Sequence, residues 1–499
     1  MNWSHWRRVR QAVQALAFAL YFYLLFAALQ RRAAFPLADL FFRLDPLGAF
    51  AAMLASRQWI PRLSLALVTL SLTLVIGRVW CGWLCPLGTL LEWVRFRSAE
   101  SRAVALSSRW RQVKNFLLVL IVVAALLGNL TLLTLDPLTL FTRTMTTAVL
   151  PALNHAVTGM ERALYTRSAL RPVVNWIERV LRGPVLPVIQ PVYAHNVLMA
   201  AIFVSILALN ALADRFWCRY LCPLGALLGL VSKVSLLRPV FGTACNRCGQ
   251  CVEACHLDAI DTRQTFEIVP SECTVCLDCL VACPQDGITF RKELRPDPIR
   301  EGELTRRQFL TGLAASAAGV VLLRTGVGAK QPDPHLIRPP GVLDEREFLA
   351  RCLRCTQCMK VCPTSGLQPI ASESGPAGLW TPQLVLRLGY CDYSCNACGQ
   401  VCPSGAIPSL DLAQKRQAVI GVAVIDRDRC LPWAQDVPRI VCEEMCPVSQ
   451  KAITVVASGE SGGTSDMLLP YVLPDDCIGC GICEFRCPVD GESAIWVYR

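Results

Sequence analysis

Cysteine spacing constrains the fold of this chain more than any other feature. The sequence contains 27 cysteines, and most of them fall into runs of four that are separated by two or three residues. Runs of the form CxxCxxCxxxC place four thiolates where they can enclose an iron–sulfur cube. The clearest runs are Cys245, Cys248, Cys251 and Cys255; Cys273, Cys276, Cys279 and Cys283; Cys352, Cys355, Cys358 and Cys362; and Cys477, Cys480, Cys483 and Cys487. The pattern predicts several [4Fe-4S] clusters and an electron-transfer role.

Other uses of dense cysteine are weaker explanations. Secreted disulfide scaffolds are short chains, whereas this one has 499 residues, of which 53% are hydrophobic. Zinc ribbons need two CxxC pairs that lie roughly fifteen residues apart, not three successive CxxC steps. The net charge of +11 does not indicate nucleic acid, because arginines that flank apolar segments explain it as anchoring at a membrane interface.

Four apolar stretches predict membrane-spanning helices, each close to the ~20 residues that cross a ~30 Å hydrocarbon layer. They cover Val9–Leu29, Leu63–Val79, Phe116–Leu135 and Asn196–Ala213. The motif LDPL, at 44–47 and again at 135–138, precedes the second and fourth stretches, and each of these runs into a CxxxCPLG motif. We therefore expect residues 1–238 to form a membrane α-helical bundle of four transmembrane helices, built as two tandem helix-pair repeats.

The segment TRRQFL at Thr305–Leu310 precedes a mildly apolar stretch rich in Gly, Ala and Ser. It is similar to an internal twin-arginine export signal, and the alternative is a fifth anchor helix. Either interpretation sends the following residues across the membrane. We expect a protein of the bacterial inner membrane with a cytoplasmic ferredoxin at 239–295, a linker and signal or anchor helix at 296–330, and a periplasmic four-cluster ferredoxin-like domain at 331–499. A candidate cleavage site lies at Val327–Ala329.

The first two runs predict an α+β ferredoxin with two clusters, in which the fourth cysteine of each run crosses to the other cluster. One [4Fe-4S] cluster is assigned to Cys245, Cys248, Cys251 and Cys283, and the other to Cys273, Cys276, Cys279 and Cys255. His256 stands where proline usually follows the fourth cysteine. We expect no haem attachment there, because both neighbouring cysteines already have a use.

Residues 352–487 contain 15 cysteines in four runs, one fewer than four cubes require. In the third run Arg439 stands where the second ligand belongs, and arginine stays protonated and cannot coordinate iron. We expect a [3Fe-4S] cluster there, or a [4Fe-4S] cluster whose fourth iron takes water or an unusual ligand. The alternative is that another residue fills the gap.

Sequential pairing of these four runs, and nesting of the second and third runs inside the outer two, both fit the linkers. We favour nesting, because the segment between the second and third runs is typical of a hairpin inside one ferredoxin unit. Nesting gives three [4Fe-4S] sites and one incomplete site, with these ligands: Cys352, Cys355, Cys358 and Cys487; Cys477, Cys480, Cys483 and Cys362; Cys391, Cys395, Cys398 and Cys446; and Cys430, Cys442 and Cys402.

The two CxxxCP motifs contain Cys81 and Cys85, and Cys218 and Cys222. On a helix, the i, i+4 spacing puts each pair on one face, and the repeat is expected to bring the pairs together. They form a candidate metal site or quinone-proximal redox site. The alternative is that they are small buried side chains in a tight Pro-Gly turn.

Asp45 and Asp136 precede proline in the two LDPL motifs. Aspartate at the N-cap followed by proline is an ordinary helix start, and the alternative is a carboxylate that accepts a quinol proton. None of the five histidines lies within an apolar stretch, so the axial ligands of a membrane haem are missing. We expect iron–sulfur clusters as the only redox cofactors, with no haem and no flavin.

Taken with these motifs, the N-terminal half resembles the NapH type of quinol dehydrogenase, and the four-run half resembles its NapG partner and the related MauN and MauM pair. The resemblance implies that the chain takes electrons from the membrane quinone pool and delivers them to a periplasmic reductase or cytochrome. CxxxCP membrane ferredoxins also resemble an oxidase maturation protein, so metal reduction or assembly of a respiratory oxidase is the alternative function. A third possibility is an anchored module that only docks a redox partner.

Overall fold

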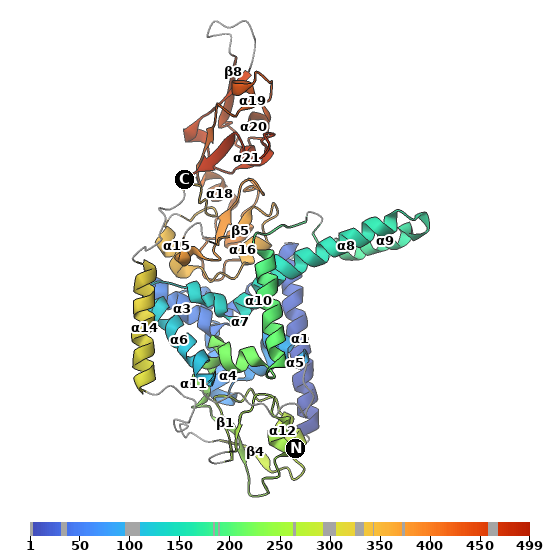
Figure 1. Cartoon of the computed structure of the whole chain (residues 1–499), viewed down its shortest axis with the longest axis vertical. Helices are drawn as coiled ribbons and strands as arrows, with labels where there is room; N and C mark the ends of the chain where they lie inside the picture. The colour runs from blue at the N-terminus through green and yellow to red at the C-terminus, as the bar shows by residue number, and fades with distance from the viewer. Residues whose placement is uncertain are drawn as a thin grey trace. The chain divides into compact units, whose positions relative to one another are not determined.

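The computed structural model describes residues 3–30, 37–94, 110–182, 185–187, 190–262, 266–292, 306–324, 334–342, 344–371, 375–457 and 468–499. The chain divides into two compact units (Figure 1). Unit 1 comprises Met1–Ala27, Leu37–Met145 and Val197–Arg324, and unit 2 comprises Ala28–Pro36, Thr146–Asn196 and Thr325–Arg499.

Unit 1 combines a helical part with a small two-cluster ferredoxin. The helical part consists of α1 (Trp3–Leu29), α2 (Leu40–Arg43), α3 (Pro46–Ser56), α4 (Ala66–Ile76), α5 (Pro86–Trp93), α6 (Arg111–Leu126), α7 (Pro137–Thr144), α10 (Asn196–Ala208), α11 (Pro223–Ser232) and α14 (Arg306–Arg324). The LDPL and CxxxCPLG motifs sit at helix starts: Asp45, Cys85, Asp136 and Cys222 are the N-caps of α3, α5, α7 and α11, each followed by proline. Proline pre-sets the first helical turn, which explains why the repeated motifs begin helices.

Among the described helices, α1 alone is long and apolar enough to cross a membrane. The other predicted spans contain helix breaks that composition does not reveal. Helix α4, with 11 residues, stops at Gly77, which has a left-handed φ of 92°; at 1.5 Å per residue it is only ~17 Å long. Helix α6 ends before Gly128, and α10 has 13 residues. The prediction of a four-helix transmembrane bundle is therefore wrong.

Helix α14, yellow in Figure 1, packs against α6. A Cβ atom built on Gly312 of α14 would lie 3.1 Å from the ring of Phe116 on α6, so the two helices approach closely at this point. The TRRQFL stretch from Arg306 onward begins this helix. Thr305 and the candidate cleavage site at Val327–Ala329 lie outside the described residues.

The ferredoxin of unit 1 has the expected α+β plan. Strands β1 (Leu237–Phe241) and β4 (Ile288–Lys292) pair antiparallel, so the chain enters and leaves the ferredoxin side by side. Between them lie α12 (Gln250–Ala254), the short hairpin β2 (Ile260–Asp261) and β3 (Glu267–Ile268), and α13 (Asp278–Ala282). The hairpin turns the chain back after the first run, so that the second run meets the first.

Unit 2 repeats this plan twice. Hairpin β5 (Leu367–Pro369) and β6 (Pro382–Leu384) separates the Cys352 and Cys391 runs, and hairpin β8 (Ile453–Ala457) and β9 (Leu468–Val472) separates the last two runs. Strands β7 (Val422–Ile425) and β10 (Ile495–Tyr498) pair antiparallel around that second half. The short helices are α15 (Glu345–Arg351), α16 (Gln357–Lys360), α17 (Ala397–Gln400), α18 (Leu412–Gln417), α19 (Leu431–Ala434), α20 (Val441–Glu444) and α21 (Ile482–Arg486).

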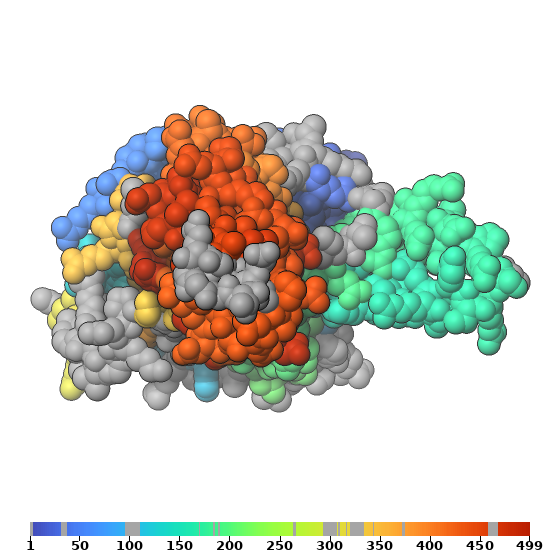
Figure 2. All heavy atoms as spheres, turned by 90° about the horizontal axis from the view of Figure 1, so that it is seen from above, coloured from blue at the N-terminus to red at the C-terminus, as the bar shows by residue number. Residues whose placement is uncertain are grey.

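Unit 2 also contains α8 (Leu150–Tyr165) and α9 (Arg171–Ile177), teal in Figures 1 and 2, which lie side by side. Arg182, which follows α9, forms an ion pair with Glu161 and donates to the Asn154 side chain at 2.6 Å. The orange and red residues that face the viewer in Figure 2 belong to the ferredoxin halves of this unit.

Candidate iron–sulfur sites

The first ferredoxin groups its cysteines as the sequence predicts. Burial, together with the nearby thiols of Cys245, Cys283 and Cys248, raises the pKa of Cys251 to about 11. The other four thiols line one cavity of about 450 Å³ with apolar neighbours; they are Cys255, Cys273, Cys276 and Cys279. In such surroundings a protonated thiol is favoured over a bare thiolate, unless a positively charged metal group takes the place of the protons.

The CxxCxxC loops share a backbone signature. In four runs, the residues on either side of the second cysteine are both left-handed, with φ between 54° and 87°. Successive turns of this kind aim backbone N–H groups at one point and are typical of iron–sulfur sites. The pairs are Arg247 and Gly249, Val275 and Leu277, Arg354 and Thr356, and Gly479 and Gly481. Non-glycine residues there are strained by roughly 1 kcal/mol each, so the loops maintain this shape against their own preference.

In unit 2 the four runs pair sequentially, which corrects the nested pairing expected from sequence. Cys402 shares a cavity of about 370 Å³ with Cys352, Cys355 and Cys358, where nesting placed Cys487. Cys362 lies with Cys391, Cys395 and Cys398, and Cys446 shares a cavity of about 320 Å³ with Cys477, Cys480 and Cys483. The ligand sets of the two halves therefore follow the same crossing rule as the first ferredoxin.

The linker between the second and third runs explains the difference. Nesting required this segment to form a hairpin, but Asp411 caps helix α18 through a capping box with Gln414. The chain then enters β7, which pairs with β10 after the last run instead of turning back on itself. The segment thus connects two complete ferredoxin halves.

The incomplete site consists of Cys430, Cys442 and Cys487, in a cavity of about 390 Å³ that is also lined by Arg439. Sequence reasoning had placed Cys402 here in the position of Cys487. The cavity matches the four-cysteine cavities in size, and its remaining lining is apolar: Ile425, Leu431, Pro432, Val441, Pro488, Val489, Ala494 and Ile495. No fourth thiol, imidazole or carboxylate lines the described cavity, so a cluster here would have one iron without a protein ligand.

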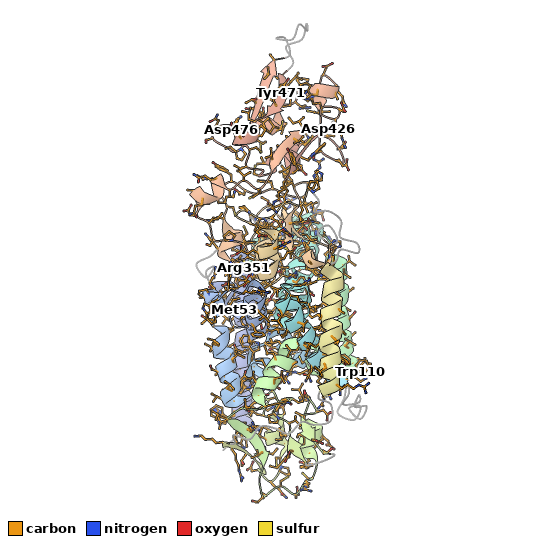
Figure 3. All side chains as sticks on the ribbon, turned by 90° about the vertical axis from the view of Figure 1, so that its left-hand side faces the viewer. Met53, Trp110, Arg351, Asp426, Tyr471 and Asp476 are labelled. Atoms are coloured by element: carbon orange, nitrogen blue, oxygen red, sulfur yellow. The ribbon has the colours of Figure 1, made fainter. Side chains whose placement is uncertain are left out.

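Aromatic packing fixes the third run next to this cavity. The indole of Trp433 on α19 donates to the carbonyl oxygen of Pro470 at 3.1 Å, and its ring lies edge-on to Tyr471 at 5.2 Å between centroids. Asp426, at the end of β7, donates its backbone N–H to Ala494. Tyr471 and Asp426 are labelled in Figure 3. The unusual Cys430 to Cys442 spacing is thus part of an ordered structure.

The two CxxxCP pairs converge, as the repeat predicts. The charges of Cys81 and Cys218 act on the thiol of Cys85, and those of Cys218, Cys81 and Cys85 act on Cys222. Burial, the largest cause, raises the pKa of both Cys85 and Cys222 well above the ordinary thiol value. The Sγ atoms of these two N-cap cysteines accept the backbone N–H of Gly88 at 3.5 Å and of Gly225 at 3.2 Å.

Within the described residues, no group of three or more His, Cys, Asp or Glu side chains surrounds a single metal ion. In a [4Fe-4S] site each thiolate binds a different iron, so its ligands stand further apart than those of one ion. The CxxxCP cysteines are thus a group of two buried thiols, Cys85 and Cys222, and two half-buried ones, Cys81 and Cys218, and any metal at that position stays a prediction.

Both CxxxCP elements contact residues next to one cluster site, that of Cys255, Cys273, Cys276 and Cys279. From the first repeat, Trp83 donates through its indole to the carbonyl oxygen of Val275 at 3.0 Å, and Arg78 donates to that of Ser271 at 2.7 Å. From the second repeat, Arg219 reaches the carboxylate of Asp258 at 3.2 Å.

Gly82 marks a close approach between the helical part and the ferredoxin. A Cβ atom there would meet the Thr274 carbonyl oxygen well inside van der Waals contact and would lie 3.2 Å from Thr274 Cβ. The second repeat has Arg219 at the equivalent position. Sequence reasoning missed this docking surface, although the Gly-to-Arg difference between two otherwise similar motifs was a signal of it.

A buried ion-pair network supports the same region. Glu92 of α5 pairs with Arg10 of α1 at 2.8 Å and with Arg215 at 2.5 Å, and Gln14 donates to it at 2.9 Å. Burial acts to raise the pKa of Glu92, but the charges of Arg215 and Arg10 outweigh it and lower the pKa to about 2. Lys114 of α6 pairs in the same way with Glu272 at 2.6 Å.

The LDPL aspartates cap helices, as expected. Asp45 accepts the backbone N–H groups of Leu47 at 3.0 Å and Gly48 at 3.2 Å, and Asp136 accepts that of Thr139 at 2.9 Å. The two carboxyl groups also lie within hydrogen-bonding reach of one another. Sequence alone gave no sign of this pairing.

Three ferredoxin folds with cluster-sized, cysteine-lined cavities define the class of this protein: it is a ferredoxin-type iron–sulfur electron-transfer protein. A family described as a 4Fe-4S binding domain matches residues 58–102 and 196–243, and one described as a 4Fe-4S dicluster domain matches residues 440–490. The first family matches twice, once over each CxxxCP motif, which agrees with the tandem repeat.

Known proteins narrow the class to a family. The methylamine utilization ferredoxin-type protein MauM of Methylorubrum extorquens is 36% identical over 201 residues, which cover 39% of this chain and 88% of MauM. The ferredoxin-type protein NapG of Escherichia coli is 34% identical over 200 residues, 37% of this chain and 82% of NapG. The chain belongs to this MauM and NapG family of ferredoxin-type proteins. No solved structure matches it.

Proposed function

We propose that this protein oxidises a membrane quinol and passes the electrons through iron–sulfur clusters to a periplasmic reductase or cytochrome. The observation that carries the proposal is the contact of both CxxxCP elements with residues next to the Cys255, Cys273, Cys276 and Cys279 site. The thiol group and this cluster site are neighbours, so electrons released beside the thiols have a nearby acceptor.

The proposed cofactors are five [4Fe-4S] clusters and one [3Fe-4S] or atypical [4Fe-4S] cluster. Their ligands are the cysteine groups described above, with Cys430, Cys442 and Cys487 at the incomplete site. When bound, the clusters supply one-electron transfer. The chain's own contribution is to hold them in apolar cavities and to leave one iron of the last site open.

We also propose that the protein resides in the bacterial inner membrane, with the first ferredoxin in the cytoplasm and the second in the periplasm. Helix α1, with 27 residues and a mean hydropathy of 2.0 over its most apolar window, is the proposed anchor. Large apolar side chains on α4 and α10, including Leu67 and Val197, are more than half exposed, which agrees with an apolar environment around unit 1.

The test is anaerobic addition of a soluble quinol analogue to the purified full-length protein, with cluster reduction followed by EPR. We expect the clusters of the first ferredoxin to be reduced. A Trp83→Phe variant removes the 3.0 Å hydrogen bond to Val275 but keeps an aromatic ring, and should slow this reduction while leaving reduction by dithionite unchanged. If dithionite reduces the wild-type clusters but the quinol analogue does not, the proposed function is wrong, and a docking module is the better description.

A further inference from the structure

The LDPL aspartates form a buried pair that their helix-capping role does not explain. Asp45 and Asp136 are 2% and 1% exposed, and they belong to equivalent helix starts of the two repeats. Oδ2 of Asp136 accepts the backbone N–H of Thr139. Its other oxygen, Oδ1, is buried and has no donor among the described residues. A protonated Asp45 carboxyl can donate a hydrogen bond to Asp136 there. Two adjacent buried carboxyl groups cannot both ionise, so such a pair retains a proton.

Among the described residues, no basic side chain is one of the main influences on the two carboxyl groups. The described elements packed on α3 and α7 are α2, α4, α5, α6, α11 and the 3-10 helix Thr131–Leu135. Of these, α4, α11 and the 3-10 helix contain no charged residue. The charged groups of the others have known partners: Asp39 pairs with Arg43 and Arg62, Glu92 with Arg10 and Arg215, and Lys114 and Arg111 with Glu272 and Asp258. Arg143 on α7 donates to the Thr134 carbonyl oxygen. A proton is therefore the charge that compensates the pair.

The pair lies next to the thiol group. The charge of Asp136 acts on the thiol of Cys85, which caps α5. The CxxxCP elements also contain two buried indole N–H groups without an acceptor in the described structure, those of Trp80 and Trp217 at equivalent repeat positions. Buried donors without partners are rare. They provide hydrogen bonds for a ligand with acceptor oxygens, such as the two oxygens of a quinone.

We propose that Asp45 and Asp136 share one proton and serve as the proton acceptor when a hydroquinone is oxidised beside the CxxxCP thiols. This inference rests on the proposed function. Oxidation of one hydroquinone to the quinone breaks two O–H bonds and releases two electrons and two protons. The electrons leave singly to one-electron iron–sulfur acceptors. Each proton passes in turn to the ionised carboxyl of the pair, which returns it to water before the next.

The pair keeps its shared proton at neutral pH. Burial, the largest cause, raises the pKa of both carboxyls, with that of Asp136 at about 6 and that of Asp45 well above its ordinary value. A singly protonated pair therefore exists at neutral pH, and it can both take and release a proton there.

The test uses full-length protein in detergent and the variants Asp45→Asn and Asp136→Asn. Asparagine preserves the shape and keeps one hydrogen bond across the pair but removes the shared proton. Asp39→Asn is the matched control, because Asp39 is equally buried but is paired with the guanidinium groups of Arg43 and Arg62. Cluster absorbance serves as the check of folding. Infrared spectroscopy at neutral pH should show a protonated-carboxyl band in the wild type and in Asp39→Asn, and a loss of this band in both pair variants.

The second measurement is the rate at which a soluble hydroquinone reduces the clusters. Removal of a positioned proton acceptor is expected to slow this rate about 100-fold in each pair variant, with reduction by dithionite unchanged. The inference is overturned if the band persists in both pair variants, or if they reduce at the wild-type rate. If hydroquinone fails to reduce the wild type although the band behaves as expected, the proposed function is wrong and the role as hydroquinone proton acceptor fails with it, while the shared proton is established.

Discussion

Gly82→Ala tests the docking of the ferredoxin on the first CxxxCP element. The added methyl would press on the Thr274 carbonyl oxygen and lie 3.2 Å from Thr274 Cβ. Both neighbours are constrained, since Thr274 lies between two cluster ligands and the next residue, Val275, is held by Trp83. Overpacking of this kind costs about 1–3 kcal/mol, which corresponds to a fall of roughly 2–10 °C in the melting temperature of a unit this size.

The assay is the loss of cluster absorbance on heating, combined with the rate of cluster reduction by a quinol analogue. Gly229→Ala is a second variant on the other repeat, where the new Cβ would lie 2.9 Å from the Ser271 carbonyl oxygen. Gly159→Ala, with no atom within 4 Å of its Cβ, is the control and should keep the wild-type midpoint or raise it slightly. A wild-type melting temperature and reduction rate in Gly82→Ala would refute this contact, and with it the proposed passage of electrons from the thiols to the neighbouring cluster.

Further predictions concern charge and ligands. Glu92→Ala leaves two buried guanidinium groups, those of Arg10 and Arg215, without their carboxylate. It should lower the free energy of unfolding, measured with denaturant, by about 3–5 kcal/mol. Because the pKa of Glu92 is lowered to about 2, the stabilisation by its carboxylate is present above pH ~4.5 and is lost as the pH falls through 2. Arg439→Cys should supply the missing thiolate and abolish the EPR signal of an oxidised [3Fe-4S] cluster, while Arg439→Ala should retain it. Cys402→Ala should eliminate the same cluster signal as Cys355→Ala, whereas nested pairing would have the two variants affect different clusters.

The sequence predicted the ferredoxins well, because their spacing is a chemical requirement of the cofactor. The crossing rule assigned Cys283 and Cys255 correctly from position alone. In the second unit the crossing rule also holds, but nesting applied it to the wrong pairs of runs and so misplaced Cys362, Cys402, Cys446 and Cys487. The pairing there depends on whether the linker before β7 is a hairpin, and Asp411 makes it a capped helix. The left-handed residues around each second cysteine follow from the loop geometry, which composition does not reveal.

The helical part was predicted less well, for a different physical reason. A hydropathy average counts apolar residues but does not detect the turns between them. It therefore predicted continuous helices across Gly77 and Gly128, where the helices of the structure end. Contacts between distant segments were also invisible to it. The pairing of Glu92 with Arg10 and Arg215, and that of Asp45 with Asp136, join residues far apart in the chain, and each residue alone looks like an ordinary cap or surface charge.

The two repeats differ in sequence where they contact the ferredoxin. This difference places the CxxxCP thiols next to one particular cluster site. If the two repeats were identical, their CxxxCP elements could contact the two cluster sites of the pseudo-symmetric ferredoxin equally. Instead Gly82 admits the Thr274 loop in the first repeat, while Arg219 reaches Asp258 in the second. Both contacts involve residues near ligands of the same site: Thr274 lies between Cys273 and Cys276, and Asp258 follows Cys255 by three residues. Under the proposed function, this asymmetry makes that one cluster the expected point of electron entry, and the Cys245 site would pass the electrons onward.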